Sequence, residues 1–221
     1  LLRFALLWAV PMGLIILLRD LGLLLLLNTV LVIMLYAVSR KPGYLVVGSL
    51  GVLLSGLAVG AVSAHARARF DVWLNPFADP TGKGWQILQG LSAMYAGGLW
   101  GAGIGAGAPQ SVPIVSSDFI YAALAEELGI IACVLLVLIF VMLALRGWTI
   151  AAQARGPFGL LLGVGLTAMI TVQALLNVGG VVKAIPMTGI PLPFVSQGGS
   201  SLVAALVMVG LLAAISDGRR G

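Results

Sequence analysis

The sequence predicts an all-α protein, a polytopic bundle of transmembrane helices with about six spans. Of the 221 residues, 61% are hydrophobic and only 9% are charged, whereas charged residues make up about a quarter of a soluble domain. Several apolar stretches approach or exceed the roughly 20 residues needed to cross a hydrocarbon core of about 30 Å. Charges and helix-breaking residues separate these stretches. We therefore expect one integral membrane domain over residues 1–221, with lipid as its solvent.

Each predicted span is an apolar run bounded by a polar or irregular break. The spans are residues 1–18, 21–38, 44–63, 119–145, 158–182 and 201–215. Residues 64–118 form a long outer loop, and residues 183–200 form a second one. Within the first loop, apolar residues at helical spacing from Trp85 to Ala96 predict a short amphipathic helix at the membrane interface. The chain opens without the charged start and cleavage site of a signal peptide, so we expect it to begin mid-protein.

The charges predict how the chain crosses the membrane. A formal charge of +5 would suggest nucleic acid as a partner of a soluble protein, but in a membrane protein the placement of the charges carries the information. A cytoplasmic C-terminus places seven basic residues inside: Arg3, Arg40, Lys41, Arg146, Arg155, Arg219 and Arg220. The positive-inside rule favours this orientation. We expect no nucleic-acid partner, and we expect the acidic residues to gather on the outer face.

Asp118 stands directly before a predicted span, at the end of the long outer loop. Any residue of Ser116-Ser117-Asp118 can be the helix N-cap, since short polar side chains satisfy the first free amides. A carboxylate at the lip of a membrane cavity is also partly desolvated, which suits a general base. The two roles can coexist.

Glu126 and Glu127 are expected roughly 12 Å further along the same helix, because each residue adds about 1.5 Å. An ionisable group at that depth is costly and faces a cavity or a charged partner. Two interpretations stay open, a functional role and a structural pair with Arg67, Arg69 or Lys183.

Residues 186–201 cannot form a regular helix, because three prolines and three glycines stand among the apolar residues. Irregular backbone at membrane depth is tolerated only where it is buried in protein or lines a water-filled cavity. We therefore expect a re-entrant segment that rims a site. Lys183, just before it, supplies a cation for an anionic group or extends to the membrane interface.

The glycine-rich run 97–107 also has two interpretations. Its backbone amides can form nests for phosphate oxygens, or the run can be a flexible loop. It lacks the lysine and the serine or threonine of a phosphate-binding loop. No His, Cys or carboxylate cluster has metal-ligand spacing, and His65 stands alone, so we expect neither a metal nor another cofactor.

Five blocks of the sequence carry a resemblance to a known family. They are Leu74-Asn75-Pro76 with Asp79-Pro80, Gly82, Gly84 and Gln86; Gly97-Gly98 to Gly105; Ser117-Asp118-Phe119-Ile120 with Glu126-Glu127-Leu128-Gly129; Gln173 and Asn177; and residues 186–201. Together they resemble the SEDS family of cell-wall polymerases, the group of RodA, FtsW and SpoVE. The last block is similar to the family's P-x-T-G-x-x-L-P-F-x-S-Y-G-G-S-S. Two departures stand out: Gln197 replaces the usual tyrosine, and Leu18-Arg19-Asp20-Leu21-Gly22 stands where Gln-Pro-Asp-Leu-Gly is common.

The resemblance implies the C-terminal six of ten spans of a peptidoglycan glycosyltransferase. Such an enzyme polymerises lipid II into glycan strands at the outer face of the bacterial cytoplasmic membrane, in elongation, division or sporulation. Asp118 then matches the essential aspartate, which we expect to act as the general base toward the acceptor sugar. Seven residues are expected to bind substrate, with Arg69 and Lys183 best placed to stabilise the pyrophosphate: Arg67, Arg69, Gln86, Lys183, Thr188, Ser196 and Gln197. Glu126 and Glu127 are expected to support the site.

The resemblance further implies three partners: lipid II with its lipid-linked glycan strand, membrane lipid, and a class B penicillin-binding protein that crosslinks the strand. A transporter or flippase of lipid-linked precursors is the alternative, because broken helices and buried charges also describe transporters. A transporter needs access from both faces, whereas the acids and irregular segments of this chain are expected on one face. A scaffold that only recruits a transpeptidase is a third possibility.

Overall fold

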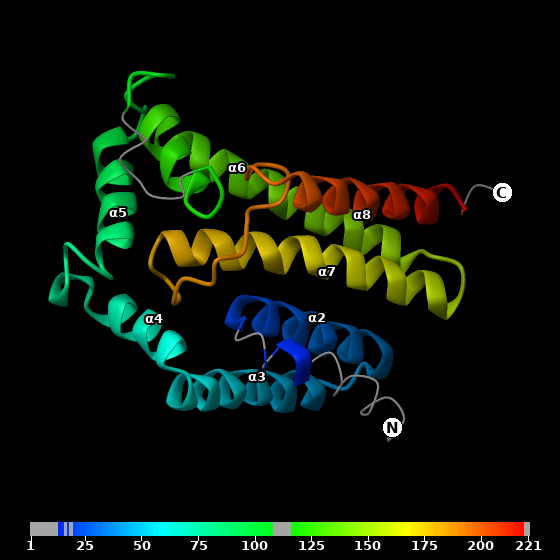
Figure 1. Cartoon of the computed structure of the whole chain (residues 1–221). Helices are drawn as coiled ribbons and strands as arrows, with labels where there is room; N and C mark the ends of the chain where they lie inside the picture. Colours follow the sequence, from blue (N-terminus) through cyan, green and yellow to red (C-terminus); the bar gives the residue numbers. More distant parts are fainter. Residues whose placement is uncertain (1–12, 16, 18–19, 108–115, 219–221) are drawn as a thin grey trace.

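The structure, a computed structural model, describes residues 13–15, 17, 20–107 and 116–218. In this part of the chain it contains α-helices, one 3-10 turn and no strand, which confirms the predicted all-α class (Figure 1). The elements are α2 (Leu21–Ser39), α3 (Gly43–Val62), α4 (Ala64–Leu74), η1 (Pro76–Ala78), α5 (Trp85–Gly97), α6 (Ile120–Ala152), α7 (Gly156–Val181) and α8 (Gly199–Asp217).

Four helices are long and apolar enough to cross a membrane, namely α2, α6, α7 and α8. Helix α3 occupies the range of the span predicted at 44–63, and its apolar stretch Gly43–Leu54 is shorter than these four. The span predicted at 1–18 lies almost wholly outside the described residues, as do Arg3, Arg19, Arg219 and Arg220. The described helices therefore support a multi-pass membrane protein.

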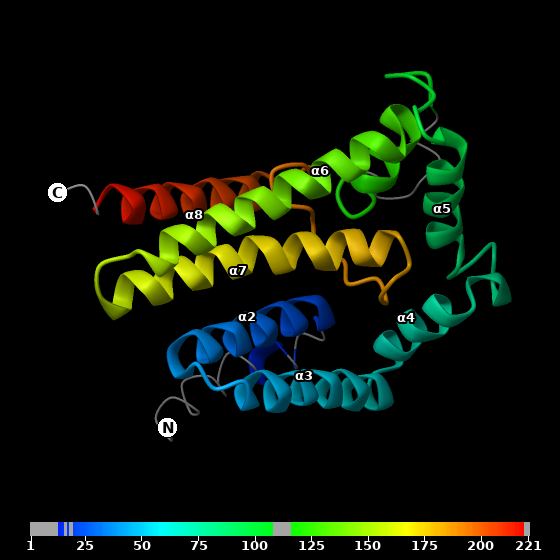
Figure 2. The ribbon, with the colours of Figure 1, turned by 180° about the vertical axis from the view of Figure 1, so that it is seen from behind.

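The long helices run side by side, and two shorter helices cross one end of them (Figures 1 and 2). Helix α7 packs between α2 and α6, while α3 packs on α2, and α8 packs on α7 and α6. Helices α4 and α5 lie at the end of the bundle that also holds the irregular segment 182–198, drawn in orange. This end is where the predicted site residues gather.

The ends of α2 show how local sequence defines a helix. The carboxylate of Asp20 caps the N-terminus by accepting a 2.9 Å hydrogen bond from the amide of Leu23. At the other end Arg40 adopts a left-handed conformation (φ 52°), and its amide donates to the carbonyl of Tyr36. Pro42 follows two residues later, so the chain turns and starts α3.

The outward faces of the long helices are apolar. On α6, Leu135, Met142 and Leu145 expose more than half of their surface, and α8 exposes Val203 and Leu206 in the same way. In water such a continuous apolar surface would drive association. In a bilayer it is the surface that contacts lipid, as the apolar composition predicts.

The segment 64–118 is more ordered than its sequence pattern predicts. The amphipathic pattern at 85–96 predicts one helix, and α5 confirms it. The structure adds α4, which lacks an apolar stripe because Arg67, Arg69 and Asp71 interrupt it. The hydroxyl of Ser63 caps α4 by accepting a 3.4 Å hydrogen bond from the amide of Ala66. Long-range contacts then hold it in place.

Candidate functional site

Asp118 lies in the turn that precedes α6. The helix begins at Ile120, its N-cap is Phe119, and no side chain caps it. The N-cap interpretation of Ser116, Ser117 and Asp118 is therefore wrong. Among the described residues, no side chain or amide forms a hydrogen bond or ion pair with the half-buried carboxylate of Asp118. It is available to a ligand.

The backbone of this turn is held by α7. Asn177 is 1% exposed, and its side-chain amide donates to the carbonyl of Asp118 at 3.0 Å and to that of Ile190 at 2.8 Å. One turn earlier on α7, Gln173 donates to the carbonyl of Pro191 at 3.0 Å. One helix thereby holds both the Asp118 turn and the segment 182–198.

The irregular segment also contacts the Asp118 turn directly. The hydroxyl of Ser196 donates to the carbonyl of Ser117 (2.5 Å) and accepts from the amide of Leu192 (2.7 Å). The amide of Gln197 donates to the carbonyl of Ser116 at 2.7 Å. These bonds satisfy backbone groups that an irregular segment would otherwise leave unpaired. The segment is irregular, as predicted.

Helix α4 contributes a guanidinium from the other side. Nη1 of Arg69 donates to the carbonyls of Met187 (3.1 Å) and Thr188 (2.8 Å). Nε1 of Trp73, one turn later, donates to the carbonyl of Lys183 at 3.0 Å. A planar guanidinium carries five donors in a fixed arrangement. Nη1 anchors α4 to the segment, and Nη2 and Nε have no hydrogen-bond partner among the described residues.

Gly189 separates the guanidinium from the carboxylate. It adopts a positive φ of 74°, and a Cβ at this position would lie 3.5 Å from Nη2 of Arg69 and 3.7 Å from Oδ2 of Asp118. Both charged groups are therefore within 4 Å of the same point, without a direct ion pair between them. A side chain here would be strained and would fill the space between the two charges.

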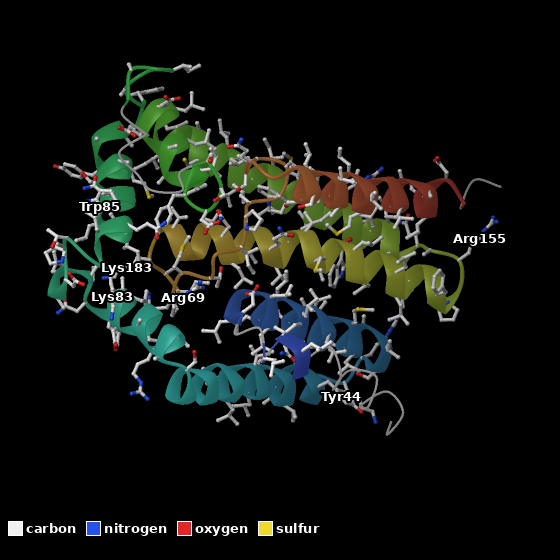
Figure 3. All side chains as sticks on the ribbon, in the orientation of Figure 1. Tyr44, Arg69, Lys83, Trp85, Arg155 and Lys183 are labelled. Atoms are coloured by element: carbon white, nitrogen blue, oxygen red, sulfur yellow. The ribbon has the colours of Figure 1, made fainter. Side chains whose placement is uncertain are left out.

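A cleft of about 380 Å³ opens at this place. Asp118, Arg69, Lys83 and Gln86 supply its polar walls, and apolar side chains complete it, namely Val72, Ile87, Phe119 and Met187. The charged lining residues comprise two cations and one carboxylate, a balance that suits an anionic ligand. The three basic residues Arg69, Lys83 and Lys183 gather at the end of the bundle formed by α4 and α5, whereas Arg155 lies at the opposite end (Figure 3).

The structure brings together only part of the predicted substrate-binding set. Of its seven residues, Arg69 and Gln86 line the cleft together with the predicted base Asp118, and the remaining five do not: Arg67, Lys183, Thr188, Ser196 and Gln197. Arg67 is exposed on α4, and Thr188 is 6% exposed with its hydroxyl fully buried. Lys183 and Ser196 contribute the bonds described above. Lys83 lines the cleft although no sequence pattern indicated it.

Glu126 and Glu127 lie away from the cleft, against the glycine-rich run. Helix α6 is interrupted at Gly129 (φ 82°, ψ 172°), within the range of the span predicted at 119–145. Four backbone hydrogen bonds join the run to this break: Ala102 N to Glu126 O (2.8 Å), Gly103 N to Glu127 O (3.0 Å), Ile130 N to Gly98 O (3.0 Å) and Ile131 N to Leu99 O (3.4 Å). The carboxylate of Glu127 also accepts from the amide of Gly105 at 3.2 Å.

The glycines permit this close backbone approach. A Cβ on Gly101 would collide with the carbonyl of Glu127, and a Cβ on Gly129 would collide with that of Leu99. The run is thus a docked segment, and the flexible-loop interpretation does not describe it. Neither Arg69 nor Lys183 forms an ion pair with Glu126 or Glu127 in the described structure, so a structural pair with either cation is excluded there.

The described residues contain no group of three or more His, Cys, Asp or Glu side chains arranged to hold a metal ion. The polar side chains that line the cleft are a carboxylate, a guanidinium, an ammonium and an amide. These groups can accept a proton and bind an anion.

Fold and site together define a class of protein, a multi-pass helical membrane protein with a carboxylate and cations in a cleft at one end of the bundle. The chain belongs to the FtsW/RodA/SpoVE family of cell cycle proteins, whose sequence profile matches residues 1–221. The resemblance found in the sequence motifs is confirmed.

Three relatives illustrate the match. The chain is 38% identical to peptidoglycan glycosyltransferase RodA of Mycobacterium tuberculosis H37Rv over 213 residues, covering 96% of this chain and 45% of the relative. It is 37% identical to probable peptidoglycan glycosyltransferase FtsW of Geobacter metallireducens over 206 residues, 92% of this chain and 55% of the relative. It is 41% identical to stage V sporulation protein E of Bacillus subtilis over 192 residues, 86% of this chain and 52% of the relative.

A solved structure has the same fold. It matches 94% of this chain and 58% of its own with a TM-score of 0.75 and 26% identity, and it comes from a study of the structural coordination of polymerization and crosslinking by a peptidoglycan synthase complex. The chain spans about half the length of the curated relatives it matches.

Proposed function

We propose that the full-length protein is a peptidoglycan glycosyltransferase that polymerises lipid II into glycan strands at the outer face of the bacterial cytoplasmic membrane. Relatives named peptidoglycan glycosyltransferase, at 37–38% identity, support the class of reaction. The choice of lipid II follows from the family resemblance and from the chemistry of the cleft.

One observation carries the proposal. The carboxylate of Asp118 lines a cleft, has no hydrogen-bond partner among the described residues, and lies within 4 Å of the same point as the guanidinium of Arg69. A base and a cation at this separation can act on the same reaction, the base on the attacking hydroxyl and the cation on the leaving diphosphate. This is the requirement of a glycosyl transfer from a lipid diphosphate.

Asp118 is proposed as the general base. The 4-hydroxyl of the acceptor sugar attacks the anomeric carbon of the lipid-linked donor, and its proton passes to the carboxylate. The new carbon–oxygen bond forms as the bond from the anomeric carbon to the phosphate oxygen breaks, and the bonding electrons leave with undecaprenyl diphosphate. Proton transfer to a positioned base contributes about a hundredfold to ten-thousandfold to such a rate.

Arg69 is proposed to stabilise the departing diphosphate, because negative charge accumulates there in the transition state. Nη1 is fixed on two carbonyls, so the guanidinium is oriented before substrate binds and Nη2 can donate to phosphate oxygens. Lys83 adds a second cation, and Gln86 an amide, in the same cleft.

The remaining predicted residues are proposed to act without contacting the reacting atoms. Ser196, Gln197 and Thr188 support the cleft through the segment 182–198. Arg67 and Lys183 are proposed to attract anionic substrate to this end of the bundle. Glu126 and Glu127 support the site by holding the glycine-rich run.

Orientation and partner follow from the same proposal. The irregular segment, α4 and α5 gather at one end (Figure 1), and we assign that end to the extracytoplasmic face, with the C-terminus in the cytoplasm. The partner is a class B penicillin-binding protein. The solved complex, which concerns polymerization and crosslinking, supports such an assembly.

A transporter or flippase of lipid-linked precursors is the alternative. The cleft and the irregular segment lie at one end of the bundle, which favours chemistry at one surface. Radiolabelled lipid II offered to the purified full-length protein in detergent distinguishes the two. Labelled polymer supports the glycosyltransferase, whereas translocation in liposomes without polymer supports the transporter and contradicts our proposal.

A further inference from the structure

The glycine-rich run carries three large apolar side chains that are exposed in the described structure. Leu99 exposes 62% of its surface, Trp100 81% and Ile104 84%. The backbone of the run is hydrogen-bonded to α6, so these side chains lie on the side of the run that faces away from its bonded partners. We call the three residues the apolar tip.

The sequence around the apolar tip differs from that of a loop in water. Between Lys83 and Asp118 the chain has no charged residue, whereas charged residues make up about a quarter of a soluble domain. Single exposed apolar residues are common on soluble proteins. A group of three in a long uncharged segment instead marks a contact with a membrane or with another protein.

The apolar tip is continuous with the lipid-facing surface of α6. The amide of Ile131 donates to the carbonyl of Leu99 at 3.4 Å, so the run lies beside the start of the uninterrupted part of α6 (Figure 1). Ile130, Ile131 and Val134 are exposed there, on a helix long and apolar enough to cross a membrane. Lipid that covers these side chains also reaches the tip beside them.

The length of α6 places the tip at the boundary of the membrane. Beyond the break at Gly129, α6 continues to Ala152, and Trp148 near that end is 44% exposed. Ile130 and Trp148 are 18 residues apart on the helix, about 27 Å at about 1.5 Å per residue. This distance nearly equals the thickness of a hydrocarbon core, about 30 Å. Tryptophan favours both membrane interfaces, and Trp100 and Trp148 lie at the two levels that this thickness defines.

Lipid fits the tip better than a protein partner does. Specific protein interfaces carry about ten hydrogen bonds and a polar rim. In the run 97–107, the indole N–H of Trp100 is the only polar side-chain group. A membrane interface requires little more than apolar surface and aromatic rings that present one polar edge to the headgroups.

We propose that the apolar tip inserts into the membrane interface and fixes the depth of the cleft relative to the lipid headgroups. The run continues directly from α5, whose residues Gln86 and Ile87 line the cleft. Insertion of the tip therefore anchors one end of α5 in lipid and limits its movement relative to the bilayer. This inference names a membrane contact and does not depend on the proposed reaction.

Spin labelling of the full-length protein tests the contact. In a background without other cysteines, Trp100→Cys and Ile104→Cys each receive a nitroxide, and the protein is reconstituted into liposomes of phosphatidylethanolamine and phosphatidylglycerol. Power saturation then measures collisions of the nitroxide with oxygen, which concentrates in lipid, and with a water-soluble nickel complex. Ile139→Cys is the lipid reference, because Ile139 is 54% exposed midway between Ile130 and Trp148. Ala78→Cys is the water reference, because Ala78 is exposed beside the charged Asp79.

We expect both tip positions to collide with the nickel complex several-fold less than Ala78→Cys does, and to collide with oxygen at a rate between those of the two references. The reason is that a label at the interface is shielded from water but lies less deep than a label at the centre of the span. Nickel collisions equal to those of Ala78→Cys would overturn the proposal and leave the tip to a protein partner.

Photolabelling of the unmodified protein does not depend on how any variant folds. The probe is phosphatidylcholine with a diazirine near the start of one acyl chain, added to the same liposomes, and mass spectrometry locates the adducts. We expect adducts on residues 99–104 as well as on α6, and background levels on residues 75–82. Adducts on α6 without any on residues 99–104 would overturn the proposal. Neither measurement requires turnover, so failure of the glycosyltransferase assay and failure of this inference are separate results.

Discussion

Asn177 donates a 3.0 Å hydrogen bond from its side-chain amide to the backbone carbonyl of Asp118. The same amide donates to the carbonyl of Ile190 at 2.8 Å, so one buried side chain on α7 joins the turn of the proposed base to the irregular segment. The orientation of the base thus depends on a residue that does not line the cleft.

Asn177→Leu preserves the side-chain size but leaves two carbonyls without their donor, the buried one of Ile190 and the partly buried one of Asp118. Each unsatisfied group costs about 1–3 kcal/mol, so we expect a lower unfolding temperature and a lower polymerisation rate of the full-length protein. Thr171→Val is the control, because within the described part of the chain the Thr171 hydroxyl bonds only to a carbonyl of its own helix. Asn177→Leu behaving like Thr171→Val in both measurements would refute the positioning role.

Asp118→Asn removes the proton acceptor while it preserves size and the backbone bond from Asn177. We expect polymerisation of lipid II to fall about a hundredfold to ten-thousandfold, with the unfolding temperature unchanged. Asp71→Asn is a matched control, because Asp71 is an exposed carboxylate on α4 that does not line the cleft. Normal polymer formation by Asp118→Asn would remove the base from the mechanism.

Much of the fold could be predicted from the sequence because lipid imposes a simple rule. Apolar runs of membrane length had to be helices, and they end where Arg40 and Pro42 or the turn around Arg155 interrupt them. The short polar helix α4 escaped prediction, since its stability comes from contacts of Arg69 and Trp73 with a segment more than a hundred residues away.

The site was predictable only in part, for a similar reason. Asp118 and Gln86 belong to recognisable motifs, and Arg69 was predicted as a cation of the outer loop. Lys83 is a basic residue of the same loop, but it sits in a turn without periodicity, and no pattern distinguished it. The meeting of Arg69, Gly189 and Asp118 joins three distant segments, and no local pattern encodes it. The break at Gly129 could not be predicted from the sequence either, because an isolated glycine is tolerated in helices.

Arg69→Lys should separate the anchoring of α4 from the binding of phosphate. A lysine keeps the charge, but its single ammonium group cannot bond the two carbonyls and also offer a pair of donors to the phosphate. We expect a KM for lipid II raised about tenfold or more, consistent with loss of a charge-assisted bond of about 1.5–3 kcal/mol. Arg67→Lys, in the same helix but outside the cleft, is the control. Equal KM values for the two variants would contradict the assignment.

Gly101→Ala should undock the glycine-rich run from α6. The new methyl group would meet the Glu127 carbonyl at a backbone φ of 82°, and strain at a positive φ alone costs about 1–3 kcal/mol. Gly105→Ala has a similar φ of 75° but open space around the methyl group. It therefore carries the backbone strain without the collision with a carbonyl. We expect the unfolding temperature to fall further for Gly101→Ala. The reverse order would show that the run is not docked as described.

Lys83→Ala tests the residue that the sequence motifs did not indicate. Its ammonium group lines the cleft, and its side chain forms no bond with another described residue, so removal should not destabilise the fold. We expect weaker binding of undecaprenyl diphosphate by a few-fold to about tenfold, with a reduced dependence of affinity on salt, because one partly exposed cation is lost.

Lys183→Ala is the comparison at the same end of the bundle (Figure 3). Since Lys183 does not line the cleft, its removal should change the affinity less. A larger loss for Lys183→Ala would mean that the diphosphate binds nearer to the start of the irregular segment than to Asp118, and the general-base geometry would then have to be abandoned.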